Sequence, residues 1–158
     1  MSMTDLLQRE TRRGSPSESP RRSETDASSI PENGLFRIAR VLFGAVLAFM
    51  ATDNLRSLEG RVQFAETKGV PVPSFSVPAI SGGLLFGGIG IALWRVPAAS
   101  AAAVAGFFAT ATPLMHDFWN IDDPEAKQQQ INDFSKNTAL LGAALAFVQL
   151  GRSTEPDA

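Results

Sequence analysis

The feature that most constrains the fold is an uncharged stretch between Arg95 and Asp117. Its length of about 20 residues matches the apolar thickness of a lipid bilayer when the chain is helical. A core helix of a water-soluble protein is usually shorter and carries polar residues along one face. This stretch holds only weakly polar Ser and Thr among Ala, Val, Phe, Gly and Leu, and charge arrives together with a tryptophan at its end, Met115 to Trp119. The pattern predicts a membrane span that leaves the lipid at this end.

Three other apolar stretches predict further spans. The first covers residues 35–52, where Arg37 and Arg40 can extend their charged ends to the headgroups while their stems stay in the apolar layer. The second covers residues 79–94 and has no charged side chain. The last covers residues 134–150. Together with the uncharged stretch they predict four membrane-spanning helices.

The segments between the spans are short. Residues 55–70 mix charged and apolar side chains at helical spacing and predict a short surface helix. Residues 71–78 are rich in proline and predict an extended connection, with Pro78 at the first turn of the next helix. Residues 120–133 are polar, and the order Asp-Pro-Glu at 123–125 is typical of a helix start. A second short surface helix is therefore expected there.

These elements predict an all-α fold, a transmembrane up-down-up-down four-helix bundle, because short connections join antiparallel neighbours. The bundle is expected to occupy residues 35–152. Residues 1–34 are polar and hold few large apolar side chains, so they predict a disordered tail, and residues 153–158 predict a short polar tail. The mean hydropathy of +0.03 hides the spans because it averages them with the long tail.

The distribution of Lys and Arg indicates the orientation of the bundle. Six basic residues fall on the side of the two termini: Arg21, Arg22, Arg37, Arg40, Arg95 and Arg152. Five fall on the other side: Arg56, Arg61, Lys68, Lys127 and Lys136. Because basic residues are in excess on the cytoplasmic side, this count favours a multi-pass protein of the plasma membrane with both termini in the cytoplasm.

The alternating direction of the spans brings polar residues to one face of the bundle. We take His116 and Asp117 as candidate catalytic residues, since histidine is the residue type suited to proton exchange near neutral pH. The remaining polar residues predict a binding mouth formed by Asp53, Asn54, Trp119, Lys136 and Asn137. Lys136 is expected to pair with Asp53 or Asp117, because polar groups at membrane depth are costly unless paired. The alternative is that these residues, with Trp94, only mark the boundary between lipid and water.

Small residues recur at a spacing of four in two of the spans. Gly83 and Gly87 share one face of the second span, and Gly142 shares a face with Ala146 in the last span. Small residues allow a neighbouring helix to approach closely. We therefore expect Gly83, Gly87 and Gly142 to be helix-packing positions, and the same faces are compatible with a homo-oligomer.

The composition excludes several classes of function. The chain has no cysteine, which excludes disulfides, thiolate catalysis and iron–sulfur clusters held by this chain. A single histidine leaves no multi-histidine metal site, so we expect no metal and no cofactor bound by this chain alone. The net charge of −2 argues against a nucleic-acid partner. The expected partner is the lipid bilayer.

Several short motifs follow one another in an order that is typical of one family. They are Arg37-Ile-Ala-Arg40, Gly69-Val-Pro-Val-Pro73, Gly87-Gly88, Arg95, His116-Asp-Phe-Trp119 and Phe134-Ser-Lys-Asn-Thr-Ala-Leu-Leu-Gly142. With them, residues 35–151 resemble the DoxX family of small four-helix membrane proteins, and the lack of cysteine and the acid-leaning charge are similar to its haloarchaeal members. The chain departs from the family at two places, where Leu84-Leu-Phe86 replaces a common Glu and Asp53-Asn54 replaces a common Lys.

The resemblance implies a membrane location and a link to quinone-dependent sulfur oxidation and other membrane redox complexes. We therefore expect a non-catalytic subunit or scaffold of a quinone-linked redox system, associated with oxidoreductase subunits. The first alternative is a quinone-reactive oxidoreductase component in which His116 exchanges a proton. The second alternative is a small transporter of solutes or lipids that uses the same polar mouth.

Overall fold

The computed structural model describes residues 33–154, and the regular structure of these residues is entirely helical. The helices are α2 (Gly34–Arg56), α3 (Leu58–Thr67), α4 (Pro73–Leu93), α5 (Pro97–Met115), the short 3₁₀ helix η2 (Phe118–Asn120) and α6 (Pro124–Thr154). The prediction of an all-α fold is confirmed for this part of the chain. The predicted tail over residues 1–34 lies outside the described residues except for its last two positions, and residues 155–158 of the C-terminal tail also lie outside them.

The first two helices begin and end where the local sequence favours it. The Asn33 side chain caps α2 by accepting a hydrogen bond of 2.9 Å from the Leu35 N–H. α3 follows after Ser57 alone and ends before Gly69, whose φ of +70° suits glycine. The short surface helix predicted within residues 55–70 is confirmed.

The proline-rich connection before α4 was predicted wrongly. Residues 71–78 were expected to be extended, but α4 begins at Pro73 and contains Pro78. Pro73 occupies the first helical turn, where its missing N–H costs little. Val72 makes the bend before it with a φ of 46°, and the Ser76 hydroxyl donates to the Pro71 carbonyl at 2.7 Å. A helix therefore replaces the extended segment, with Pro78 as an interior residue.

The polar segment before the last span was also predicted wrongly. Two elements were expected, a surface helix near residue 124 and a span over residues 134–150, but α6 is one continuous helix of 31 residues. No proline or glycine interrupts it before Gly142, so nothing in the sequence breaks the helix at residue 133. The start was predicted correctly, because the Asp123 carboxylate accepts a hydrogen bond of 2.8 Å from the Ala126 N–H. The helix also continues to Thr154, beyond the expected boundary at residue 152.

Replacement of the Asp123 cap tests this helix start. We expect Asp123→Ala to lower the free energy of unfolding by about 1 kcal/mol, because it leaves an N–H of the first turn without its acceptor. The matched control is Asp122→Ala, which removes an exposed acid one residue earlier and should change stability by less than about 0.5 kcal/mol. Amide hydrogen exchange in the first turn of α6 checks the result, and equal effects of the two variants would contradict the cap.

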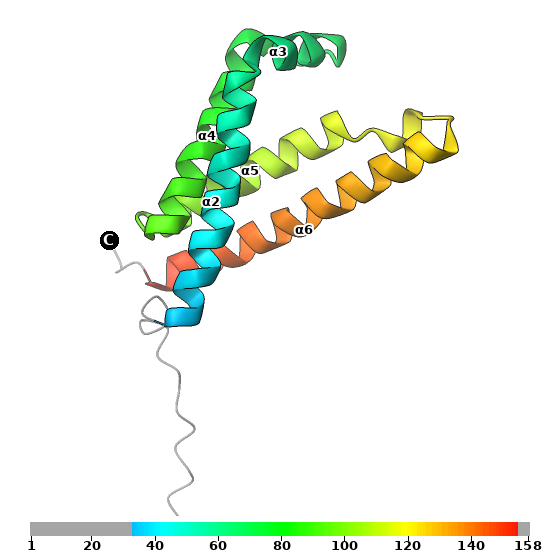
Figure 1. The fold of residues 1–158 in the computed structure, drawn as a ribbon. Helices are drawn as coiled ribbons and strands as arrows, with labels where there is room; N and C mark the ends of the chain where they lie inside the picture. The colour runs from blue at the N-terminus through cyan, green and yellow to red at the C-terminus, as the bar shows by residue number, and fades with distance from the viewer. Residues whose placement is uncertain (1–32, 155–158) are drawn as a thin grey trace, which may run out of the picture.

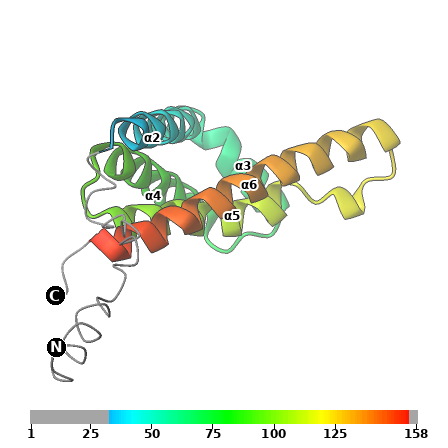
Figure 2. The same ribbon diagram turned by 90° about the horizontal axis from the view of Figure 1, so that it is seen from below.

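The long helices pack in sequence order, α2 against α4, α4 against α5 and α5 against α6. Neighbours in this series run antiparallel, since Arg40 near the start of α2 bonds Ala92 near the end of α4, and His116 after α5 bonds Gln130 near the start of α6. Figure 1 shows the result as two pairs, α2 with α4 and α5 with α6, that meet near the C-terminal end of α6 and diverge toward η2. Seen from below in Figure 2, the N-terminal half of α6 extends well past α2 and α4. A closed four-helix bundle stays a prediction.

Among residues 33–154, three segments are long and apolar enough to cross a membrane: α2, α4 and residues Pro97–Asn120, which contain α5. α6 is not among them, so the fourth predicted span stays a prediction. The outer face of α2 fits a lipid environment, because it exposes large apolar side chains such as Leu35 (77%) and Leu42 (63%). The buried core lies between the helices and is centred on Leu84, Ile91 and Phe108.

Candidate functional site

A pocket of about 320 Å³ lies where the two helix pairs diverge, and we call it the polar pocket. It is lined by Phe49, Met50, Asp53 and Asn54 of α2, Arg61 of α3, Phe107, Phe108, Ala111 and Met115 of α5, His116, and Asp133, Lys136 and Asn137 of α6. The pocket thus has an apolar wall of aromatic and methionine side chains and a rim of polar side chains drawn from separate helices.

The structure brings together most of the residues that the sequence placed at the mouth. Asp53, Asn54, His116, Lys136 and Asn137 all line the polar pocket. Asp117 and Trp119 are not part of its lining. Trp119 is 53% exposed and its ring packs edge-on against Phe118 and Phe134.

The charged residues of the mouth do not form the predicted pair. Lys136 contacts Asp133 on its own helix at 3.1 Å, instead of Asp53 or Asp117. Asp53 pairs with Arg61 of α3 at 3.2 Å, and Asp117 pairs with Lys68 at 2.7 Å.

The prediction was wrong because cations from the α3 region pair with both carboxylates. Arg61 of α3 contacts Asp53 at the end of α2, and Lys68, the residue after α3, contacts Asp117 just beyond the end of α5. Pairs that are exposed or partly exposed add little stability, about 0–1 kcal/mol each.

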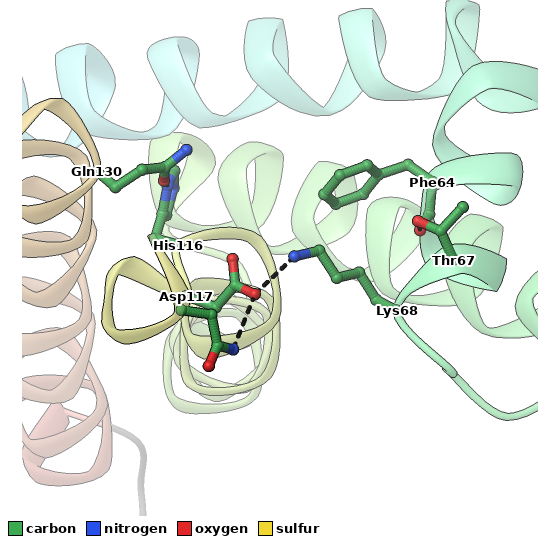
Figure 3. A network of polar contacts seen from close by, with 7 residues as sticks. Phe64, Thr67, Lys68, His116, Asp117 and Gln130 are labelled. Atoms are coloured by element: carbon green, nitrogen blue, oxygen red, sulfur yellow. Dashed lines mark hydrogen bonds and ion pairs between the residues drawn. The ribbon is translucent and has the colours of Figure 1, made fainter. Parts of the chain in front are cut away.

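His116 is held by a residue that the sequence analysis did not single out. Its Nδ1 lies 2.7 Å from the amide oxygen of Gln130 on α6, and the two side chains face each other in Figure 3. In the tautomer that carries the proton on Nδ1, this nitrogen donates to the amide oxygen and Nε2 is left as the acceptor nitrogen of the ring. Gln130, Asp133 and Asn137 share one face of α6 by their spacing of three and four, and this periodicity was the available signal for Gln130.

A second pocket of about 230 Å³ lies beside the first, under α3, and we call it the α3 pocket. It is lined by Asn54, Gly60, Arg61, Phe64, Ala65, Lys68, Val70, Ser76, Val77, Ile80, Ser81, Phe107, Ala111, Leu114 and Met115. The two pockets share Asn54, Arg61, Phe107, Ala111 and Met115 as a common wall. The sequence pattern could have identified the residues from the α3 region. Arg61, Phe64, Ala65 and Lys68 are spaced by three or one and therefore lie on one face of a helix.

The predicted helix-packing glycines behave differently from one another. A methyl group at Gly87 would collide with Val104 and the Ser100 carbonyl of α5, so this glycine lies at a tight helix contact. At Gly83 and Gly142 it would meet no atom within 4 Å. The glycines at the close contact between α2 and α4 are Gly44 and Gly88. They lie on different helices, so the sequence alone does not show that they face each other.

At the opposite end of the molecule, aromatic side chains join the helix pairs. Arg40 donates to the Ala92 carbonyl at 3.2 Å and lies 5.7 Å from the Trp94 ring centre. Phe36 packs edge-on against Trp94, and Phe147 of α6 stacks on Phe43 of α2. These contacts pack α2, α4 and α6 against one another at this end.

The site offers proton-exchanging and hydrogen-bonding groups beside an apolar wall. Within residues 33–154, no three His, Asp or Glu side chains are grouped so that they could hold a metal ion. Lys136, Asn137 and Asn54 supply donors at the rim, and His116 supplies a ring nitrogen. The arrangement suits a ligand with a polar, hydrogen-bonding head and an apolar body.

The fold and the site define a helical membrane protein with a polar pocket at one end of its apolar helices. The family model for DoxX matches residues 35–117, more than half of the chain, and the chain belongs to the DoxX family. The match covers α2 to α5 and ends at Asp117, so it includes His116 but not α6. No curated protein and no solved structure matches the chain.

Proposed function

We propose that this DoxX protein is a non-catalytic subunit of a quinone-linked redox system in the plasma membrane, with both termini in the cytoplasm. In this proposal α6 completes a four-helix membrane domain, and oxidoreductase subunits are the partners. The observation that carries the proposal is the polar pocket, which combines an apolar wall with a polar rim at the end of membrane-length helices.

The residues of the polar pocket fit a quinone headgroup. Phe49, Phe107 and Phe108 would contact its ring, and Lys136 and Asn137 would donate hydrogen bonds to its oxygens. A bound quinone supplies the capacity to accept or release two electrons with two protons. This chain would hold the headgroup and limit its contact with water, while the electrons enter from a partner subunit.

A second candidate function rests on His116. When Nδ1 of this histidine donates to Gln130, Nε2 is the acceptor nitrogen of a residue that lines the polar pocket. The chain would then be an oxidoreductase component in which Nε2 of His116 takes or gives a proton at the bound headgroup.

Purification from native membranes in mild detergent tests the proposed function. We expect an oxidoreductase subunit, identified by mass spectrometry, and extractable quinone to accompany the chain. Lys136→Leu should lower the retained quinone about tenfold, because it removes a charged donor from the rim, while Lys127→Leu is the matched control on the same helix. Recovery of neither partner nor quinone would overturn the proposal.

The same preparation separates the two candidate functions. If the chain is non-catalytic, His116→Ala leaves quinone reduction by the complex within about twofold of the parent rate. If His116 exchanges the proton, the rate falls by about 10²-fold or more. Uptake of solute into proteoliposomes without any partner would instead favour the transporter alternative.

A further inference from the structure

We propose that the α3 pocket binds one anionic phospholipid, with an acyl chain among the apolar side chains and the phosphate at Arg61 and Lys68. The α3 pocket shares one wall, including Arg61, with the polar pocket assigned to the quinone, and its other lining residues are separate. The proposal follows from the position of α3, the charge of the pocket lining and an unsatisfied hydrogen-bond donor.

The position of α3 places the pocket at the level of lipid headgroups. α3 lies across the ends of α2 and α4, at the end of the apolar helices (Figure 1). Apolar residues of α4 and α5, among them Val77, Ile80 and Leu114, line the pocket on the side opposite α3. An acyl chain entering here would replace water against an almost entirely apolar surface, which is favourable in proportion to the area covered.

The charge of the lining selects the headgroup. Arg61 and Lys68 are the charged residues of the lining, and no Asp or Glu belongs to it. Each cation does have a carboxylate partner outside the pocket, Asp53 for Arg61 and Asp117 for Lys68, as Figure 3 shows for the second pair. Both pairs leave spare donors, because an ammonium has three N–H groups and a guanidinium five.

One of these spare donors has no acceptor. The Nε–H of Arg61 is buried, and no hydrogen-bond partner for it exists among the described residues. A buried donor without a partner is costly, and an anionic phosphate oxygen is a strong acceptor for a guanidinium. The Lys68 ammonium lies 5.5 Å from the Phe64 ring centre, so it is held at the pocket and not extended into solvent.

Substitutions in the Lys68–Asp117 pair distinguish a phosphate-binding role of Lys68 from a purely structural one. If Lys68 binds a phosphate, Asp117 competes for it, so Asp117→Asn should strengthen anionic lipid binding and Lys68→Gln should weaken it. If the pair only fastens α3 to the end of α5, both variants remove the same contact and change lipid binding in the same direction. The two side chains are partly exposed, so neither substitution is expected to prevent folding.

The experiment is native mass spectrometry of the full chain in mild detergent, titrated with phosphatidylglycerol or phosphatidylcholine of identical acyl chains. We expect one phosphatidylglycerol retained with at least fivefold preference over phosphatidylcholine. Asp117→Asn should raise its occupancy about threefold and Lys68→Gln should lower it about fivefold. Ala65→Phe, which fills the pocket, should lower retention of both lipids, whereas Leu42→Phe on the exposed face of α2 should not.

Equal retention of the two lipids, or a change in the same direction for Asp117→Asn and Lys68→Gln, would overturn the proposal. Retention unaffected by Ala65→Phe in a folded variant would place the lipid elsewhere and would overturn it as well. None of these measurements uses a quinone or a partner subunit, so the lipid site and the proposed redox function can fail independently.

Discussion

Replacing Gly88 by leucine is expected to force α2 away from α4 and to lower the free energy of unfolding by about 3 kcal/mol. A Cβ atom at Gly88 would lie 2.8 Å from the Ala48 nitrogen and 2.8 Å from the Gly44 carbonyl oxygen. Both are backbone atoms of α2, so they cannot rotate aside as a side chain would. The helices must separate, and the contacts along the whole pair weaken with them.

Gly83→Leu is the matched control, because it lies on the same helix and a Cβ there meets no atom within 4 Å. We expect no loss of stability in this variant, and a gain of up to about 1 kcal/mol from the better helix propensity of leucine. Unfolding by a denaturing detergent, followed by circular dichroism, measures both. If Gly88→Leu were as stable as the parent protein, the close approach of α2 and α4 would be wrong.

Truncation of Phe108 is expected to have the other large effect. Phe108 is 1% exposed, its ring packs edge-on against Phe107, and it also lines the polar pocket. Phe108→Ala should lower the free energy of unfolding by about 3 to 5 kcal/mol, because it removes a buried ring and leaves a cavity in the core. The cavity should also widen the polar pocket and loosen the hold on any ligand there.

Phe75→Ala provides the comparison, since this ring is 72% exposed. Its truncation should change stability by less than about 0.5 kcal/mol. Detergent unfolding again supplies the measurement. Similar losses for the two phenylalanine variants would show that Phe108 does not lie in the core.

The sequence predicted which segments are helical better than it predicted where each helix begins and ends. Apolar length alone identified α2, α4 and α5, because the bilayer sets the length of a spanning helix. It placed the start of α4 too late, since proline was read as a breaker although Pro73 lies at a first turn, where proline is tolerated. It predicted two helices in place of α6 because the residues before position 134 are polar, but the helix continues through them without a break.

The candidate site was predictable in part. Alternating helix direction was sufficient to bring Asp53, His116 and Lys136 to one pocket. Their partners were not predictable in the same way, because side-chain pairing depends on the path of α3 across the helix ends. Arg61 and Lys68 reach the carboxylates only once that path is known.

The corner between α4 and α5 has a mechanical consequence. Its three residues include two with left-handed backbone, Trp94 and Val96, which is a strained conformation for bulky and β-branched side chains. The Ser100 hydroxyl donates to the Arg95 carbonyl at 3.1 Å and ties the start of α5 to this corner. The chain passes from the α2–α4 pair to the α5–α6 pair through this corner of three residues. A rotation about this corner would displace the helices more with distance from it, along about 25 Å of helix, and would change the distance between Asp53 and Lys136.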